Sequence, residues 1–520
     1  MKPVRNAIVV MFDTLQHNYL GCYGNDWCKT PNMDWFATES VLFENAYGNN
    51  MPTIPVRRSM LTGRITLHEV GWGPLRPQDS TIADLAFGTG VDTAMAYNSN
   101  PLFTDRNCFA RSWATTKFSN GYNNYFFIND DLYRHSVDEY LADPGFLDRL
   151  RALPDGDFIE KAVRQEMNGY LRDKQHWKTE EDHPVAVNIR EAIRMIEARD
   201  RNHSFLLWID CWDPHEPYDP PSVWDKNMDC PYDPGYKGCD LWVPAAGICG
   251  NLYTEEQLHH IRMLYAEKIT LVDKYFGVLL DHMRKQGLWE NTLMWFTSDH
   301  GIPMGEGEWG HGLMGKCRPW PYEELVHIPL IIKYPGCPAG KRIKAFAQDC
   351  DCAPTLMDWL GMPIPETMTG HSLLPLCRGE VGKVRDFAVA GYFSFSWSII
   401  TEEWSFIHWL DKMENASQAS CNQKIYVGHT HAKEYQNQEK GKTAEEVFNA
   451  EEEYHSQRSI DGAAQWTCTA SARVDVPEGD ELYDRKTDPF QLHNVISEYP
   501  EVASQLLTQL RTFLKGLEII

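Results

Sequence analysis

Four short, continuously apolar runs constrain the fold of this chain more than any other feature. They are Ala7–Phe12, Ser204–Ile209, Thr292–Thr297 and Pro329–Lys333, and a helical pattern covers Leu258–Leu280. A short run that is apolar at nearly every position is typical of a strand buried on both faces, as in parallel sheets covered by helices. The alternation of such strands with helices predicts an α/β fold with a largely parallel central sheet.

The pattern changes near residue 386, where a second, smaller unit is expected to begin. Its predicted elements are antiparallel strands within Phe387–Ile400 and Trp404–Trp409 and a closing helix at Tyr499–Leu517. We therefore expect a catalytic domain over residues 1–385 and a C-terminal α+β subdomain over residues 386–520. A polar stretch at about residues 415–462 has no strand signal. We interpret it as a surface insertion that could cover the substrate pocket or form a homo-oligomer contact.

The composition narrows the range of partners and compartments. The 520 residues carry a formal net charge of −24, which disfavours binding to nucleic acid or to anionic membranes. An anionic substrate must then be attracted by a local positive site. No apolar run approaches the roughly 20 residues that span a bilayer, and the apolar start leads directly into Asp13. The 14 cysteines include no CxxC pair, so we expect reduced thiols and a cytoplasmic protein.

Candidate metal ligands follow two of the apolar runs. Asp13 comes directly after the first, where a carboxylate is either a ligand for a hard metal ion or a helix cap. Asp299 and His300 follow the third, and Gly301 permits the tight turn that would direct both onto one ion. Because open α/β sheets bind ligands at the ends of their strands, these residues are expected to meet.

Thr53 begins the segment Thr-Ile-Pro-Val-Arg-Arg-Ser-Met-Leu-Thr-Gly-Arg. Proline is favoured in the first turn of a helix, and a helix N-terminus offers free backbone N–H groups to an anion. Thr53 is therefore a candidate nucleophile aimed at a bound phosphate or sulfate, with Arg57 one turn on to orient it. The alternative is a threonine that merely caps the helix.

This segment closely resembles the sulfatase signature Cys/Ser-x-Pro-x-Arg-x-x-x-Leu-Thr-Gly-Arg. Further segments resemble the same family, and they are Pro214–Tyr218, Ser298–Gly301, His311–Leu313, Lys316, Tyr322–Glu324, Ile328–Ile331, Asp351–Asp358, Gly370–Pro375 and Glu481–Asp484. The resemblance spans nearly the whole chain. It implies a sulfatase-like member of the alkaline phosphatase superfamily, with an α/β/α sandwich and the smaller C-terminal subdomain.

The resemblance also implies a site. One divalent metal ion would be held by Asp13, Thr53, Asp299 and His300. Arg57, Lys316 and His215 would bind the oxygens of the substrate's transferable group, and His311 is the candidate for protonating the leaving group.

The chain departs from the family pattern at three points. Thr53 stands where the family has the Cys or Ser that becomes formylglycine, and Thr14 stands where a second Asp ligand is typical. The usual Gly-Lys-Trp-His-Leu stretch is missing, and Asn98 or Asn100 is a neutral substitute for its lysine. His300, where many sulfatases have Asn, favours Mn²⁺ or Zn²⁺ over Ca²⁺ or Mg²⁺.

The threonine decides which chemistry is favoured. A formylglycine hydrate expels sulfate by collapsing to the aldehyde, whereas a threonine ester needs a second attack at the central atom. We therefore favour a phosphate ester, phosphodiester or phosphonate ester as the small anionic substrate, cleaved through a covalent Thr53 intermediate. The alternatives are a sulfuric ester hydrolase that works without formylglycine, a phosphotransferase, and a catalytically silent binding relative.

Overall fold

The structure is a computed structural model. It describes residues 4–99, 102, 108–119, 143–152, 177–225, 227–245, 247–250, 252–316, 320–393, 395–410 and 479–517, with single residues of the stretch 156–174. Asn100 and the predicted insertion at 415–462 lie outside the described residues.

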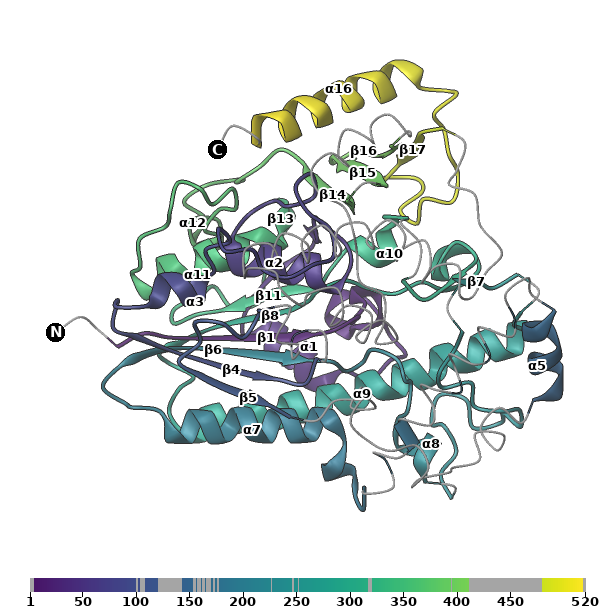
Figure 1. Ribbon diagram of the computed structural model, residues 1–520, viewed down its shortest axis with the longest axis horizontal. Coiled ribbons are helices and arrows are strands. Elements are labelled where there is room, and N and C mark those ends of the chain that lie inside the picture. The colour runs from purple at the N-terminus through teal and green to yellow at the C-terminus, as the bar shows by residue number, and fades with distance from the viewer. Residues whose placement is uncertain are drawn as a thin grey trace, which may run out of the picture.

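The central feature is an eight-stranded sheet with a mainly parallel core (Figure 1). In spatial order its strands are β12 (Lys341–Ile343), β2 (Val41–Phe43), β11 (Leu330–Lys333), β8 (Thr292–Ser298), β1 (Asn6–Phe12), β6 (Ser204–Cys211), β4 (Val91–Tyr97) and β5 (Thr115–Phe118). Strand β1 pairs in parallel with both β6 and β8. Strand β11, the fourth predicted run, is antiparallel to β8, so this edge of the sheet departs from the parallel pairing of its centre.

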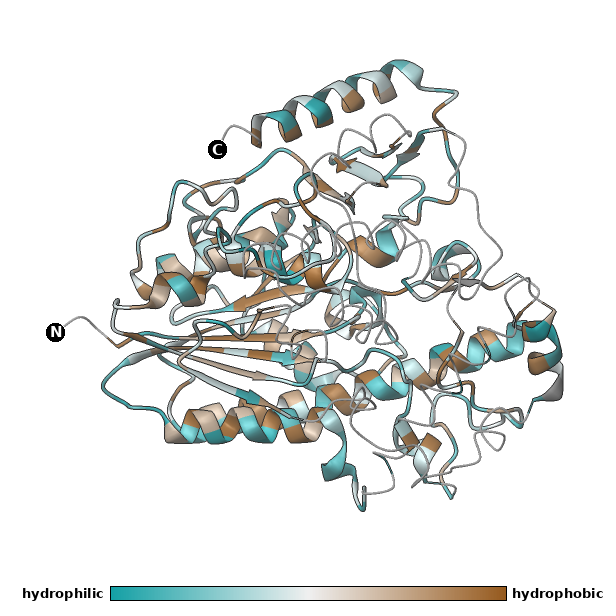
Figure 2. Cartoon of the chain, in the orientation of Figure 1, coloured by the Kyte–Doolittle hydropathy of each residue, from teal (hydrophilic) through white to brown (hydrophobic). Residues whose placement is uncertain are grey.

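Helices cover both faces of the sheet, which confirms the predicted α/β/α architecture. One layer holds α1 (Pro31–Thr38), α7 (Pro184–Ala198) and α9 (Glu255–Lys285), and the other holds α2 (Thr53–Thr62), α3 (Ile82–Ala86), α11 (Cys352–Leu360) and α12 (Leu374–Arg378) (Figure 1). Strand β1 alternates between the two cores, with Ile8 facing one and Val9 the other, as the period of two in a strand requires. Figure 2 shows the resulting hydrophobic central strands between amphipathic helices.

The remaining elements are short or belong to the C-terminal part. The short helices are α5 (Pro144–Arg151), α8 (Pro221–Trp224) and α10 (Glu323–Val326). One small sheet contains β7 (Gly247–Ile248), β10 (Leu313–Met314) and β9 (Met304–Gly305), and another contains β13 (Ala347–Gln348) and β3 (Ala46–Tyr47). The C-terminal sheet is antiparallel and contains β14 (Ala388–Tyr392), β15 (Ser396–Ile400), β16 (Trp404–Trp409) and β17 (Glu481–Asp484).

Helix α16 (Pro500–Leu517) closes this C-terminal sheet. It buries Leu506, Leu510 and Leu514 against strand residues such as Phe406, a spacing that places them on one helical face. The predicted small α+β unit is present, and the exact boundary at residue 385 stays a prediction. No helix among the described residues is long and apolar enough to cross a membrane.

The long helix α9 supports the loop that follows β6. It begins with a capping box formed by Thr254 and Gln257. In its middle, the fully buried Lys268 places Nζ 3.0 Å from Asp213 and 2.9 Å from Asp219. The same ammonium donates to the carbonyl oxygen of His215 at 3.0 Å. One buried cation therefore fixes three points of the loop.

We predict that Lys268→Met lowers the free energy of unfolding by about 3–5 kcal/mol, because the substitution leaves buried carboxylates without their cation. Lys274→Met is the matched control on the same helix. Lys274 is 58% exposed and pairs with Glu180, and such a surface pair contributes less than about 1 kcal/mol. Denaturant unfolding followed by circular dichroism measures both, and equal losses would contradict the assignment.

Candidate active site

Three acidic residues converge at the carboxyl ends of three neighbouring strands. Asp13 follows β1, Asp210 lies near the end of β6, and Asp299 follows β8. The strand register brings them together, because Phe12 pairs with Cys211 on one side and with Ser298 on the other. Asp13 and the Asp299–His300 pair therefore meet, as expected.

Asp13, Asp299 and His300 form a buried group of candidate metal ligands, called here the ligand trio. One donor atom from each lies within 4.8 Å of the others, and all three side chains are inaccessible to solvent. His300 Nδ1 donates to the carbonyl oxygen of Gly301 at 2.7 Å. Burial lowers the pKa of His300 to about 3, so Nε2 carries a free lone pair. This is the state of histidine that binds a metal ion.

Thr53 is the first residue of α2, and its hydroxyl lies beside the ligand trio. Thr53 Oγ1 is 3.2 Å from His300 Nε2 and 3.2 Å from Lys316 Nζ. Pro52 precedes the helix as its N-cap, and no side chain caps this end. Thr53 is therefore not acting as the simple helix cap that the sequence left open.

Arg57 lies in the site, and the structure corrects its expected role. Its side chain makes five hydrogen bonds, to Asp13, to Asp299, twice to Asp210, and to the carbonyl oxygen of Thr53. A guanidinium has five N–H donors, so none remains for substrate oxygens. Arg57 balances buried carboxylates and fixes the backbone of Thr53 at 3.2 Å.

The charges of the cluster fit a divalent cation. Three carboxylates, those of Asp13, Asp210 and Asp299, face two cations, Arg57 and Lys316, which leaves a formal charge of −1. Burial and the charge of Asp299 raise the pKa of Asp13 to about 8. A divalent ion would reverse the net charge to +1 and make the site attractive to an anion.

Thr14 offers a further polar atom next to the ligand trio. Its backbone N–H donates to Asp299 Oδ1 at 3.0 Å, and the residue adopts a φ of 61°. Its buried hydroxyl has no hydrogen-bond partner among the described residues. The position that carries a second Asp in the typical pattern therefore still presents an oxygen, although a neutral one.

His215 and Asn98 lie on the loops that follow β6 and β4, on the same side of β1. The His215 pKa is lowered well below its usual range by burial, and the charges of Lys316 and His300 act in the same direction. Asn98 follows β4 and accepts a hydrogen bond from the Trp212 backbone at 2.6 Å. Its buried amide nitrogen has no partner within the described part of the chain. The amide nitrogen of Asn98 can donate a hydrogen bond, whereas neutral His215, whose one N–H is bonded to the carbonyl oxygen of Glu216, offers an acceptor at Nε2.

His311 does not have the environment expected of the acid that protonates a leaving group. Its Nδ1 lies 2.8 Å from Glu324 Oε1, and its Nε2 donates to the carbonyl oxygen of Gln491 at 3.0 Å. Burial alone would lower its pKa, but the charge and hydrogen bond of Glu324 outweigh this and raise the pKa. With both nitrogens engaged, His311 links the catalytic domain to the C-terminal part.

Two residues of the site were missed in the sequence. The sequence does not single out Asp210, because the second apolar run is predicted to end at Ile209, whereas β6 continues to Cys211. An acidic residue at the end of a buried strand is the signal that could have found it. Lys268 lies 58 positions beyond Asp210 in a helix, and no local pattern distinguishes it from a surface lysine.

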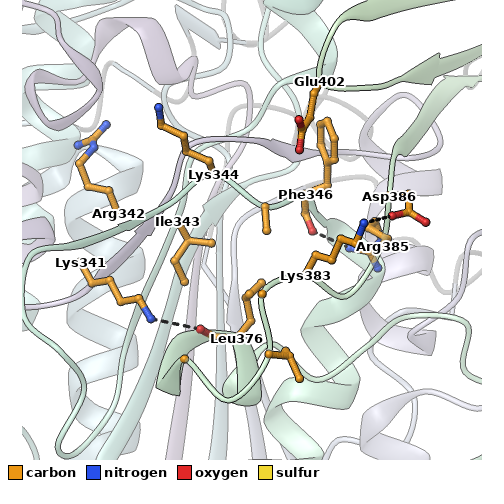
Figure 3. Close-up of a pocket in the computed structure, with 14 residues that line it drawn as sticks. Lys341, Arg342, Ile343, Lys344, Phe346, Leu376, Lys383, Arg385, Asp386 and Glu402 are labelled. Carbon is orange, nitrogen blue, oxygen red and sulfur yellow. Dashed lines mark hydrogen bonds and ion pairs between the residues drawn. The ribbon is translucent and has the colours of Figure 1, made fainter.

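A hollow of about 450 Å³ lies at the edge strand β12 and shares no lining residue with the ligand trio or Thr53 (Figure 3). Five basic side chains line it, but most already have partners. Lys341 donates to the carbonyl oxygens of Leu376 and Cys377, and the ion pairs are Arg342–Glu44, Lys383–Asp386 and Arg385–Asp351. We therefore assign no anion site there.

Sequence comparison identifies the family. The sulfatase family model matches residues 5–362, which is more than half of the chain. The chain belongs to the sulfatase family. A second model, of the C-terminal part of N-sulphoglucosamine sulphohydrolase, matches residues 307–454. The protein is therefore an ester hydrolase of the alkaline phosphatase superfamily, and this family typically binds a divalent metal ion.

Relatives and solved structures extend this likeness over most of the chain. An arylsulfatase of Clostridium perfringens is 28% identical over 76% of this chain and 82% of its own length. An N-acetylglucosamine-6-O-sulfatase of Bacteroides thetaiotaomicron is 24% identical, with 79% of each covered. The phosphonate monoester hydrolase of Agrobacterium radiobacter has the same fold, with a TM-score of 0.65, 18% identity, and coverage of 99% of this chain and 96% of that one.

We predict that Asp13→Asn reduces the metal content of dialysed protein to about a tenth of the wild-type value or less, because it removes a charged ligand. Asp210→Asn is the matched control, since Asp210 belongs to the same ion-pair cluster but not to the ligand trio. It should retain most of the metal. Elemental analysis after dialysis measures both, and equal loss in the two variants would remove Asp13 from the ligand set.

Proposed function

We propose that this sulfatase relative is a metal-dependent hydrolase of a phosphate ester, phosphodiester or phosphonate ester, and that Thr53 is its nucleophile. The observation that carries the proposal is the position of Thr53 Oγ1, 3.2 Å from both His300 Nε2 and Lys316 Nζ. The hydroxyl therefore contacts both a candidate metal ligand, His300, and the partly buried ammonium of Lys316. In the signature, Thr53 takes the place of the formylglycine precursor.

Asp13, Asp299 and His300, with Thr53, would hold one divalent ion, and one nitrogen ligand among oxygens favours Mn²⁺ or Zn²⁺. Such an ion supplies Lewis acidity that makes a nearby hydroxyl more acidic and offsets the charge of an anionic ester. Lys316 would donate to a non-bridging oxygen of the substrate and the amide of Asn98 to another, and His215 would face the same group with its acceptor Nε2. Arg57 would hold the carboxylates and the backbone of Thr53 in place.

The reaction would proceed in two displacements at phosphorus. Thr53 Oγ loses its proton to solvent and forms a bond to phosphorus as the bond to the leaving oxygen breaks. Water then attacks the same phosphorus atom, and the bond to Thr53 Oγ breaks to restore the hydroxyl. A threonine ester has no aldehyde to which it can collapse, so its release depends on this second attack. That requirement favours phosphorus over sulfur.

Sulfate ester cleavage is the second candidate, and the sequence relatives favour it. The arylsulfatase and the N-acetylglucosamine-6-O-sulfatase are both named for sulfate esters. A tetrahedral sulfate would meet the same cations as a phosphate. A sulfatase reaction in this chain would have to release sulfate from Thr53 without formylglycine.

We predict that the Mn²⁺-loaded protein hydrolyses bis(p-nitrophenyl) phosphate faster than p-nitrophenyl sulfate, measured as kcat/KM by release of p-nitrophenolate. Thr53→Ala should lower kcat/KM by about 10³-fold or more, because it removes the nucleophile. Thr53→Ser keeps a hydroxyl and should retain most of the activity. Faster sulfate cleavage would favour the second candidate, and full activity in Thr53→Ala would exclude Thr53 as the nucleophile.

A further inference from the structure

Trp212 is a large side chain next to the site that no step of the proposed reaction uses. It follows β6 directly and is 7% exposed. Its indole stacks on the imidazole of His215, with ring centroids 3.8 Å apart and an interplanar angle of 29°. A ring held face to face in this way has little freedom to rotate, so the indole restricts the orientation of His215.

The same indole also lies beneath Lys316. Lys316 Nζ is 5.7 Å from the ring centroid, within the range in which an ammonium is attracted to an aromatic face. The ammonium also lies 3.3 Å from Asp13 Oδ1. The indole and these acceptors therefore contact the same ammonium, and together they restrict where Lys316 Nζ can lie.

Two hydrogen bonds complete the arrangement. The backbone N–H of Trp212 donates to Asn98 Oδ1 at 2.6 Å, which leaves the amide nitrogen of Asn98 as its free donor. The carbonyl oxygen of Glu216 accepts from Trp212 Nε1 at 3.2 Å and from His215 Nδ1 at 2.6 Å. One carbonyl therefore aligns the edges of both rings, and Nε2 of His215 remains for a ligand.

We propose that Trp212 is a positioning residue that holds Asn98, His215 and Lys316 together as one binding surface for the tetrahedral oxyanion of the substrate. The inference rests on the proposed function, because it takes these three residues to bind the transferable group. It applies equally to phosphate and sulfate, since both present the same tetrahedron of oxygens. Trp212 acts through its neighbours and does not touch the reacting atoms.

The test compares Trp212→Leu, Trp212→Phe and the wild type, all loaded with Mn²⁺. Trp212→Leu removes the stacking face, so kcat/KM for bis(p-nitrophenyl) phosphate should fall about 10–100-fold, as expected when binding groups shift by about 1 Å. The Kd for inorganic phosphate, measured by calorimetry, should rise about tenfold. Trp212→Phe keeps a ring that can stack and should recover most of both losses.

Trp113→Leu is the matched control. Trp113 is also 7% exposed and also donates from Nε1 to a carbonyl oxygen at 3.2 Å, that of Phe109, but it packs against Trp208, within the sheet. Both leucine variants should lose similar amounts of Tm, and only Trp212→Leu should lose phosphate affinity. If the two weaken phosphate binding equally, or neither does, the proposal is wrong.

Phosphate binding also separates this inference from the proposed function. A wild-type protein that cleaves no phosphorus ester would contradict the function proposed above. Calorimetry would still decide the role of Trp212, because it requires no turnover. Selective loss of phosphate binding in Trp212→Leu would support the positioning role in that case too.

Discussion

The site depends on one buried guanidinium that holds three carboxylates from three different strands. Asp13, Asp210 and Asp299 repel one another inside the protein, and Arg57 is the charge that lets them lie together. Removing one partner of a buried ion pair costs about 3–5 kcal/mol, so this contact ties the stability of the fold to the assembly of the site. The Arg57 side chain donates hydrogen bonds to these three carboxylates and to the carbonyl oxygen of Thr53.

Because all five N–H groups of Arg57 are engaged, the positive charge that attracts an anionic substrate must come from other groups. Lys316 Nζ lies 3.2 Å from Thr53 Oγ1, and a divalent ion on the ligand trio would supply the rest. In a protein of net charge −24, an anion must be attracted by a local positive site of this kind. Because Lys316 and the divalent ion would supply the positive charge, Asn98 can contribute a hydrogen bond without a charge of its own.

The residues that the sequence predicted well are those whose signals are local. Asp13 and the Asp299–His300 pair each follow an apolar run, and Thr53 starts a recognisable helix signature. The contacts of Arg57 could not be predicted, because they depend on the register of β1, β6 and β8. Those of Trp212 depend on the path of the loop after β6, which no local pattern in the sequence specifies. His311 shows the limit most clearly. Its motif is familiar, but its partner Gln491 lies 180 positions away.

The central claim is that Thr53 becomes covalently bonded to phosphorus during turnover. The most direct test is to mix Mn²⁺-loaded protein with bis(p-nitrophenyl) phosphate, quench in acid within the first turnover, and analyse the peptides by mass spectrometry. The account predicts a p-nitrophenyl phosphoryl group on the peptide containing Thr53, located on that residue by fragmentation and missing in Thr53→Ala. Turnover with an unmodified Thr53, or with the adduct on another residue, would contradict it.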